Sequence, residues 1–210
     1  MRFCSFGMYR AVKCFGYKYL TGTECCGCGT IEDKVFMKKN LLIIGAGIYS
    51  LVAKEIAESM GCFERIAFVD DQAKKTPNGL PVIGTSSGLE QLRKEFSYVI
   101  VAIGNASVRL RLLEQVEQQY GFQVETLISP HAYISPTARI AVGCIVEPMA
   151  VVHAQVALDA GCIVSAGAVI NHAAKCGKAV HVDCNAVVAG NTTVPDGTKV
   201  YSCTVFTENK

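Results

Sequence analysis

A six-residue repeat covers the last part of the chain and limits its fold more than any other feature. Between residues 134 and 206, thirteen successive positions spaced six apart are apolar, and the position four residues after each of the first twelve is small or β-branched. In a chain that is 50% hydrophobic, chance would give thirteen such hits in only about one of ten thousand sequences. The apolar positions are Ile134, Ile140, Val146, Val152, Leu158, Val164, Ile170, Cys176, Val182, Val188, Val194, Val200 and Phe206.

A period of six does not match an α-helix, but it suits a short strand followed by a turn. One aliphatic side chain per repeat would enter a narrow core, and three repeats would complete one triangular coil, so residues three repeats apart would stack. The pattern therefore predicts a left-handed parallel β-helix of hexapeptide repeats over residues 131–210. In this fold Cys144, Cys162 and Cys176 are interpreted as small, core-filling side chains.

Residues 37–130 carry a different pattern, in which short apolar runs alternate with helical periodicity. The alternation predicts a small, doubly wound α/β unit, a Rossmann-like N-terminal domain. Its expected strands are 41–44, 65–69, 98–103 and 124–128, and its expected helices are 49–60 and 107–120.

Three sharp turns follow the expected strands of this unit: Gly45-Ala46-Gly47, Asp70-Asp71 and Gly104-Asn105. The carboxyl ends of strands are where open α/β sheets bind ligands, and a glycine turn before a helix lets a phosphate approach the backbone. The dinucleotide fingerprint is incomplete, because Ser50 occupies the place of its third glycine. A ligand site at these turns is the prediction, and a purely structural tight turn is the alternative.

Charge and composition exclude several other classes. Residues 37–210 carry fifteen basic and fifteen acidic side chains, which leaves no electrostatic footprint for nucleic acid or an anionic membrane. The chain has no Trp, and no apolar run approaches the length of a membrane helix. We expect a cytoplasmic protein with reduced thiols.

Residues 1–36 show neither strand nor helix periodicity. Cys25, Cys26 and Cys28 lie close together, but no second pair of ligands is present at a spacing that would complete a zinc site. We interpret this segment as a disordered or non-native extension and expect the fold to begin at Met37.

The order of these motifs resembles bacterial sugar acetyltransferases. Ile43-Ile44-Gly45-Ala46-Gly47, the Asp pair, Ala102-Ile103-Gly104-Asn105 and the hexads with Asn171-His172 carry the resemblance, which covers residues 39 to about 205. The most similar types are sialic-acid O-acetyltransferases and N-acetyltransferases acting on UDP-linked 4-amino sugars. The resemblance implies acetyl-CoA as co-substrate, no metal, and a homotrimer with active sites between subunits.

The resemblance also assigns roles to individual residues. His172 matches the general base, and a histidine suits that role because its ordinary pKa is close to neutrality. His181 and Gly190 are expected at the acetyl-CoA. The expected contacts to the sugar nucleotide are Gly45, Ala46, Gly47, Asp70, Asp71, Gly104 and Asn105.

Two departures keep a second interpretation open. Relatives often have an acidic residue beside the histidine, where this chain has Ala173, and the hexads stop at Phe206 without an evident cap, as in a C-terminally truncated β-helix. The alternative is a degenerate, non-catalytic relative that binds a sugar nucleotide or only assembles with partners. A γ-type carbonic anhydrase is excluded, because His153, His172 and His181 do not have the spacing of its zinc ligands.

Overall fold

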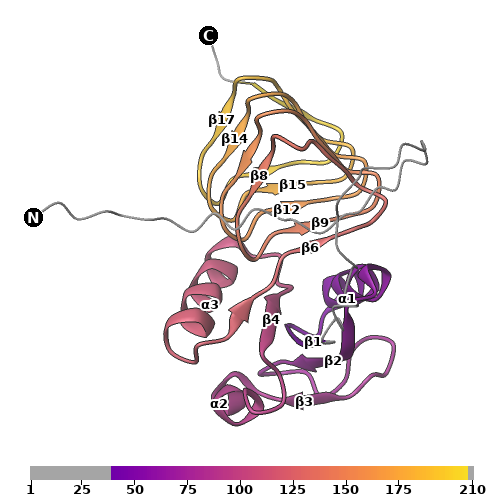
Figure 1. The fold of residues 1–210 in the computed structure, drawn as a ribbon, viewed down its shortest axis with the longest axis vertical. Coiled ribbons are helices and arrows are strands. Elements are labelled where there is room, and N and C mark those ends of the chain that lie inside the picture. Colours follow the sequence, from indigo (N-terminus) through magenta and orange to yellow (C-terminus); the bar gives the residue numbers. More distant parts are fainter. Residues whose placement is uncertain (1–38, 208–210) are drawn as a thin grey trace, which may run out of the picture.

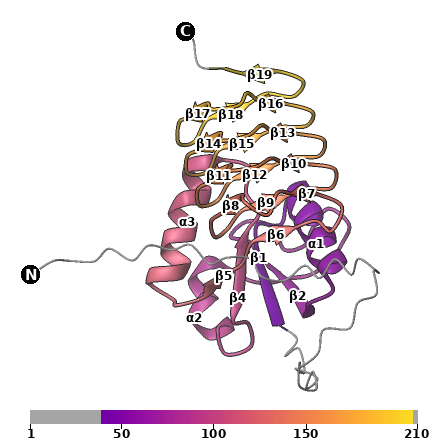
Figure 2. The same cartoon turned by 45° about the horizontal axis from the view of Figure 1, so that its top comes forward.

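The computed structural model describes residues 39–207, which form an α/β unit joined to a triangular β-helix (Figure 1). The predicted fold class is therefore confirmed. The extension predicted for residues 1–36 lies outside the described residues. Figure 2 shows the coils of the β-helix stacked as layers above the α/β unit.

The α/β unit is built on one parallel sheet with the strand order β3-β2-β1-β4-β5. Its central strands are buried because they are continuously apolar, as the sequence predicts. The segment 82–92, for which the sequence analysis predicted no element, supplies β3, η1 and α2. The elements are β1 (Lys39–Ile44), α1 (Ile48–Met60), β2 (Phe63–Val69), β3 (Val82–Gly84), η1 (Ser86–Gly88), α2 (Leu89–Leu92), β4 (Tyr98–Val101), α3 (Ala106–Gln118) and β5 (Gln123–Val124).

The β-helix contains three parallel sheets of five, four and five two-residue strands. The docking face consists of β6 (Leu127–Ile128), β9 (Ile145–Val146), β12 (Ile163–Val164), β15 (His181–Val182) and β18 (Lys199–Val200). The valine face consists of β7 (Tyr133–Ile134), β10 (Val151–Val152), β13 (Val169–Ile170), β16 (Val187–Val188) and β19 (Val205–Phe206). The polar face consists of β8 (Arg139–Ile140), β11 (Ala157–Leu158), β14 (Lys175–Cys176) and β17 (Thr193–Val194).

The second residue of each strand points into the coil, and these side chains form one core with the small residues of the corners. The three cysteines predicted to fill this core are buried in it, with exposed fractions of 0% for Cys144, 1% for Cys162 and 3% for Cys176. Burial raises the pKa of the Cys176 thiol, which keeps this side chain in its neutral form.

The strand expected at 124–128 is divided between the two units. Val124 ends β5 in the α/β sheet, whereas Leu127 and Ile128 form β6, which pairs with β9 of the β-helix. The reason is visible in the repeat itself, because Ile128 lies one hexad before Ile134 and enters the same core. The division predicted at residue 130 stays a prediction, with a first β-helix strand just ahead of it.

The α/β unit packs against the docking face through apolar side chains. Leu127 and Ile145 of that face belong to one buried cluster with Leu41, Ile43 and side chains of α1. The remaining corner of the triangle, between the valine and polar faces, points away from the α/β unit (Figure 1). We call this the distal corner; its described turns are residues 135–138, 153–156, 171–174 and 189–192.

None of the helices within residues 39–207 combines the length and the apolar character that crossing a bilayer requires.

We predict that Gly161→Ala destabilises the protein more than Gly197→Ala. Both glycines occupy the same corner column with φ near +70°, so both variants carry the same backbone strain. A Cβ on Gly161 would lie 2.7 Å from Leu113 Cδ1 on α3, whereas the nearest atom to a Cβ on Gly197 is 3.8 Å away. Overpacking of this kind costs about 1–3 kcal/mol.

Denaturant unfolding of both variants measures the difference. Equal free energies of unfolding would show that α3 does not pack tightly on this corner.

Candidate active site

The glycine turn after β1 meets the turn after β4 at the centre of the sheet. These strands are neighbours, but α1 and α3 follow them on opposite sides, so their ends mark the switch point where ligands bind in such sheets. Gly45 has φ +110°, and a Cβ there would lie 2.9 Å from the carbonyl oxygen of Ala102. Glycine is required at this position, because any side chain would force the two turns apart.

Gly47 and Gly104 border open space rather than packed atoms. No atom lies within 4 Å of the position of a Cβ on either residue. Ser50, in the place of the third fingerprint glycine, is fully buried, and its hydroxyl donates to the carbonyl oxygen of Gly47 at 2.6 Å. The serine therefore preserves the close packing of helix on strand, and both glycines leave room for a ligand at the strand ends.

The carboxylate of Asp70 is held by three backbone N–H groups of the neighbouring turns. Its Oδ2 accepts a hydrogen bond from the Ala46 amide at 2.9 Å, and its Oδ1 accepts from the amides of Gln72 and Ala73. Although burial opposes ionisation, these three N–H groups hold the pKa of Asp70 below its ordinary value. Asp70 thus fixes the glycine turn against the end of β2.

Asp71 and Asn105 also hold their own turns. The carboxylate of Asp71 accepts from the amide of Ser86 at 2.7 Å and from its hydroxyl at 2.8 Å. The Oδ1 of Asn105 caps α3 by accepting from the Val108 amide at 3.0 Å. The predicted contacts to a sugar nucleotide are therefore gathered at one edge of the sheet, and their side chains shape that edge.

His172 lies in the distal corner, with an exposed imidazole. Asn171 Oδ1 accepts the backbone N–H of His172 at 2.9 Å and lies 3.0 Å from His172 Nδ1. Because this amide oxygen has no hydrogen to donate, it can bond the ring only when Nδ1 carries the proton, and a neutral ring in that tautomer has its free electron pair on Nε2. Asn171 thus supplies the orienting contact that Ala173 cannot supply.

Gly190 lies one coil above His172, in the same column. A Cβ on Gly190 would lie 2.8 Å from His172 Cε1 and 2.9 Å from Nε2. The missing side chain is what leaves space for the ring. The Gly190 N–H has no acceptor among residues 39–207.

His181 lies elsewhere, on the docking face, where its Nε2 shares a hydrogen bond with the buried Ser165 hydroxyl at 3.1 Å. Burial lowers the pKa of His181 to about 4; nearby Lys199 and Arg109 add to this effect, and Asp183 opposes it. The imidazole is therefore neutral at physiological pH.

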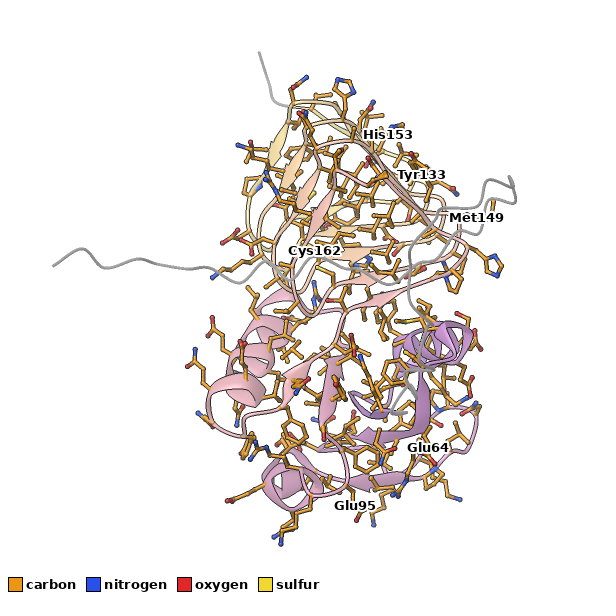
Figure 3. All side chains as sticks on the ribbon, in the orientation of Figure 1. Glu64, Glu95, Tyr133, Met149, His153 and Cys162 are labelled. Atoms are coloured by element: carbon orange, nitrogen blue, oxygen red, sulfur yellow. The ribbon has the colours of Figure 1, made fainter. Side chains whose placement is uncertain are left out.

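One chain does not bring all the predicted residues together. The strand-end residues and His181 lie on the side of the docking face, whereas His172 and Gly190 lie at the opposite, distal corner. Figure 3 shows His153, one coil below Asn171, on the far side of the β-helix from Glu64 and Glu95 of the α/β unit.

A further cleft belongs to neither group. It measures about 320 Å³ and lies between α3 and the turns that face it, where Leu113 meets Glu114, Asp159 and Lys178. Within residues 39–207, no group of three or more His, Cys, Asp or Glu side chains could hold a metal ion.

Arg109 is the residue of this region that the sequence analysis did not predict. It is fully buried, and its side chain connects the turn after β4 with the β-helix. The available signal was its position on α3, where it shares the buried stripe of Leu112, Leu113 and Val116.

Comparisons with known proteins agree with this architecture. Residues 40–116 match the family of PglD N-terminal domains. The acetyltransferase domain of PglB from Neisseria gonorrhoeae is 34% identical, with a TM-score of 0.75 over 80% of this chain and 82% of that one. Its complex with acetyl coenzyme A gives 31% identity and a TM-score of 0.70 over 80% and 93% of the two chains.

A more distant structure has the same fold. A histidine-to-asparagine mutant of perosamine N-acetyltransferase from Caulobacter crescentus, in complex with CoA and GDP-perosamine, is 26% identical, with a TM-score of 0.54 over 79% of this chain and 90% of that one. No curated protein sequence matches the chain. The level and extent of the PglB similarity show that the chain belongs to the bacterial sugar acetyltransferases, in which a PglD-type N-terminal domain precedes a hexapeptide-repeat β-helix.

Proposed function

We propose that this protein transfers the acetyl group of acetyl-CoA to a nucleotide-linked sugar in the cytoplasm, for surface glycan biosynthesis. Residues 37–130 bind the sugar nucleotide, and residues 131–210 carry the transfer. The favoured acceptor is the 4-amino group of a UDP-linked sugar, and the hydroxyl of a sialic-acid-type sugar is the second candidate. The PglB complex with acetyl coenzyme A supports the donor, and the GDP-perosamine complex supports the class of acceptor.

The observation that carries the proposal is the arrangement at His172. Asn171 Oδ1 holds the ring through Nδ1, and Gly190 leaves the side of the ring uncovered. An imidazole with one nitrogen held and the other available is suited to act as a general base. This geometry argues against the degenerate alternative, despite the loss of an acidic neighbour at Ala173.

The chemistry follows from these positions. The acceptor nitrogen attacks the thioester carbonyl, a C–N bond forms, and His172 Nε2 takes the proton that the nitrogen loses. The C–S bond then breaks, and the proton passes to the leaving CoA sulfur. The free N–H of Gly190 suits the negative charge that develops on the carbonyl oxygen. Neutral His181 is the second proposed contact to acetyl-CoA.

The active site requires a second copy of the chain. A sugar nucleotide bound at the strand ends lies beside the docking face, on the opposite side of the coil from His172 of the same chain. A neighbouring protomer must therefore present its distal corner to that edge. This requirement supports the predicted homotrimer, in which sites form between subunits.

The valine face is the surface we assign to this assembly. Its outward side chains are apolar on every coil, and both ends of the row are exposed, Tyr133 by 57% and Val205 by 62%. Figure 3 shows Tyr133 along this side of the β-helix, next to His153. A continuous apolar row of this kind is unfavourable in water, so its burial favours association. The row consists of Tyr133, Val151, Val169, Val187 and Val205.

The direct test is an acceptor screen. The full chain is incubated with acetyl-CoA and a panel of UDP-linked amino sugars, GDP-linked amino sugars and sialic acids, and the release of free thiol is followed. Release with one UDP-linked 4-amino sugar is the expected result. Absence of release with every acceptor would support the degenerate alternative instead.

We predict that His172→Ala lowers kcat by about 10²–10⁴-fold, the usual effect of removing a general base, and leaves sugar-nucleotide affinity unchanged. His131→Ala is the control, because His131 is also exposed but lies outside the distal corner. Steady-state kinetics and calorimetry measure both quantities. Full activity of His172→Ala would exclude this residue as the base.

We predict that Gly190→Ala impairs transfer without unfolding the protein. The new methyl group would push the exposed His172 ring away from its position against Asn171, so we expect kcat to fall by at least about tenfold, as for other misplaced catalytic groups. Gly88→Ala is the control, since no atom lies within 4 Å of a Cβ at Gly88. Wild-type turnover in Gly190→Ala would contradict the assigned ring position.

We predict that Val187→Glu converts the trimer to monomers and abolishes activity, because a carboxylate would be buried in the assembled valine face. Thr193→Glu places the same charge on the polar face and should leave the trimer intact. Sedimentation equilibrium distinguishes the two. A wild-type chain that sediments as a monomer at micromolar concentration would refute the assembly and the composite site together.

A further inference from the structure

Arg109 is a fully buried arginine whose partners are all backbone atoms. Its exposed fraction is 0%, and no ion pair within residues 39–207 includes it. A buried guanidinium is costly unless its donors are satisfied. This cost in free energy suggests that the hydrogen bonds of Arg109 do more than allow the side chain to pack.

The guanidinium joins the turn after β4 to the β-helix. Nη1 donates to the carbonyl oxygens of Ile103 at 2.6 Å and Gly104 at 2.9 Å. Nε donates to Gly161 O at 2.7 Å, and Nη2 donates to Ala179 O at 2.8 Å. One planar group therefore holds the turn after β4 and the corners of two successive coils in a fixed relation.

These bonds determine where two backbone N–H groups point. In a trans peptide the C=O group and the N–H group of the next residue point in opposite directions. Because the carbonyls of Ile103 and Gly104 point toward Arg109, the N–H groups of Gly104 and Asn105 point away from it. Neither N–H has an acceptor among residues 39–207.

The open side of this turn is the one that a ligand can reach. No atom lies within 4 Å of a Cβ position on Gly104, and Gly45 of the facing turn is in close approach to Ala102. The two unpaired N–H groups therefore belong to the edge assigned above to the sugar nucleotide.

We propose that Arg109 is a positioning residue for sugar-nucleotide binding. It holds the two peptide groups after β4 so that the N–H groups of Gly104 and Asn105 are available to an oxygen acceptor of the nucleotide. The inference rests on the proposed function, since it takes the strand ends as the nucleotide site. In this proposal Arg109 does not contact the substrate; it sets the orientation of the Gly104 and Asn105 N–H groups, which do.

A lysine cannot replace this arginine. The guanidinium presents several donors in a rigid plane, whereas an ammonium is a compact group on a flexible stem. Arg109→Lys keeps the charge but cannot reach the carbonyls of the turn after β4 and of both β-helix corners at once. Arg109→Gln removes the charge, retains two donors, and provides a second variant in case the lysine variant does not fold.

The experiment uses the full chain and three measurements, with Arg111→Lys, an exposed change on the same helix, as control. Calorimetry gives the affinities for UDP, GDP and acetyl-CoA, and thermal unfolding gives stability. Hydrogen exchange without ligand reports the amides of Val108 and Arg109, which are bonded to Asn105 and loosen if its turn loosens.

We expect faster exchange at these two amides in both Arg109 variants. Affinity for the nucleotide that the wild type binds should fall about tenfold, as for the loss of one hydrogen bond to a charged group. Affinity for acetyl-CoA should fall by less than the nucleotide affinity, because the proposed general base His172 and Gly190 lie at the distal corner, away from the carbonyls that Arg109 bonds.

Three outcomes would overturn the inference. A folded variant with wild-type nucleotide affinity would show that Arg109 does not position the turn. Parallel losses for nucleotide and acetyl-CoA that follow thermal stability would reduce Arg109 to a general stabilising residue. A wild-type chain that binds neither UDP nor GDP would refute the nucleotide site itself; that failure of the proposed function is seen before any variant is made.

Discussion

Each corner of the β-helix from residue 143 onward depends on one residue in the left-handed backbone conformation, and much of the structure follows from that constraint. Eleven residues with positive φ recur at every sixth position from 143 to 203, and seven of them are not glycine. Such residues are unfavourable individually, so the stacking of coils must hold them in place. Because the turns repeat without a bulge, side chains three hexads apart stack in columns. The column that holds His172 also holds Gly190, so coil geometry places the His172 ring beside the space that Gly190 leaves.

The connection between the two units has a different physical basis. Apolar contacts of Leu127 and Ile145 supply non-directional burial, which fixes the α/β unit on the docking face without specifying the orientation of its turns. Arg109 adds direction, since its four hydrogen bonds have defined lengths and angles. A buried charge satisfied only by carbonyl oxygens tolerates little displacement, because every lost acceptor leaves a desolvated donor.

Periodicity in the sequence predicted the regular elements of the structure and the side chains that fill its core. The hexads predicted the β-helix, its buried cysteines and the stacking of residues three repeats apart, and strand–helix alternation predicted the three turns at the ends of the strands. Periodicity reports which side chains are inside, but not which backbone group a polar side chain will bind. For that reason it did not show that the carboxylate of Asp70 would accept a hydrogen bond from the Ala46 amide. Nor did it show that Arg109, on the buried stripe of α3, would join the turn after β4 to the β-helix. The sequence likewise did not show on which face of the β-helix His181 lies; the structure places it on the docking face.

The separation of His172 from the strand ends makes assembly a part of the proposed catalysis. A triangular coil that docks one face on its own α/β unit leaves the opposite corner as far from that unit as the coil allows. No movement within the coil could close this distance, since each corner is fixed by the coils above and below it. Under the proposed function, His172 would therefore act on a nucleotide held by another protomer, and the valine face, which begins at the distal corner, is the surface we assign to that assembly. In the proposed trimer the same apolar row would hold the protomers together and complete the active site.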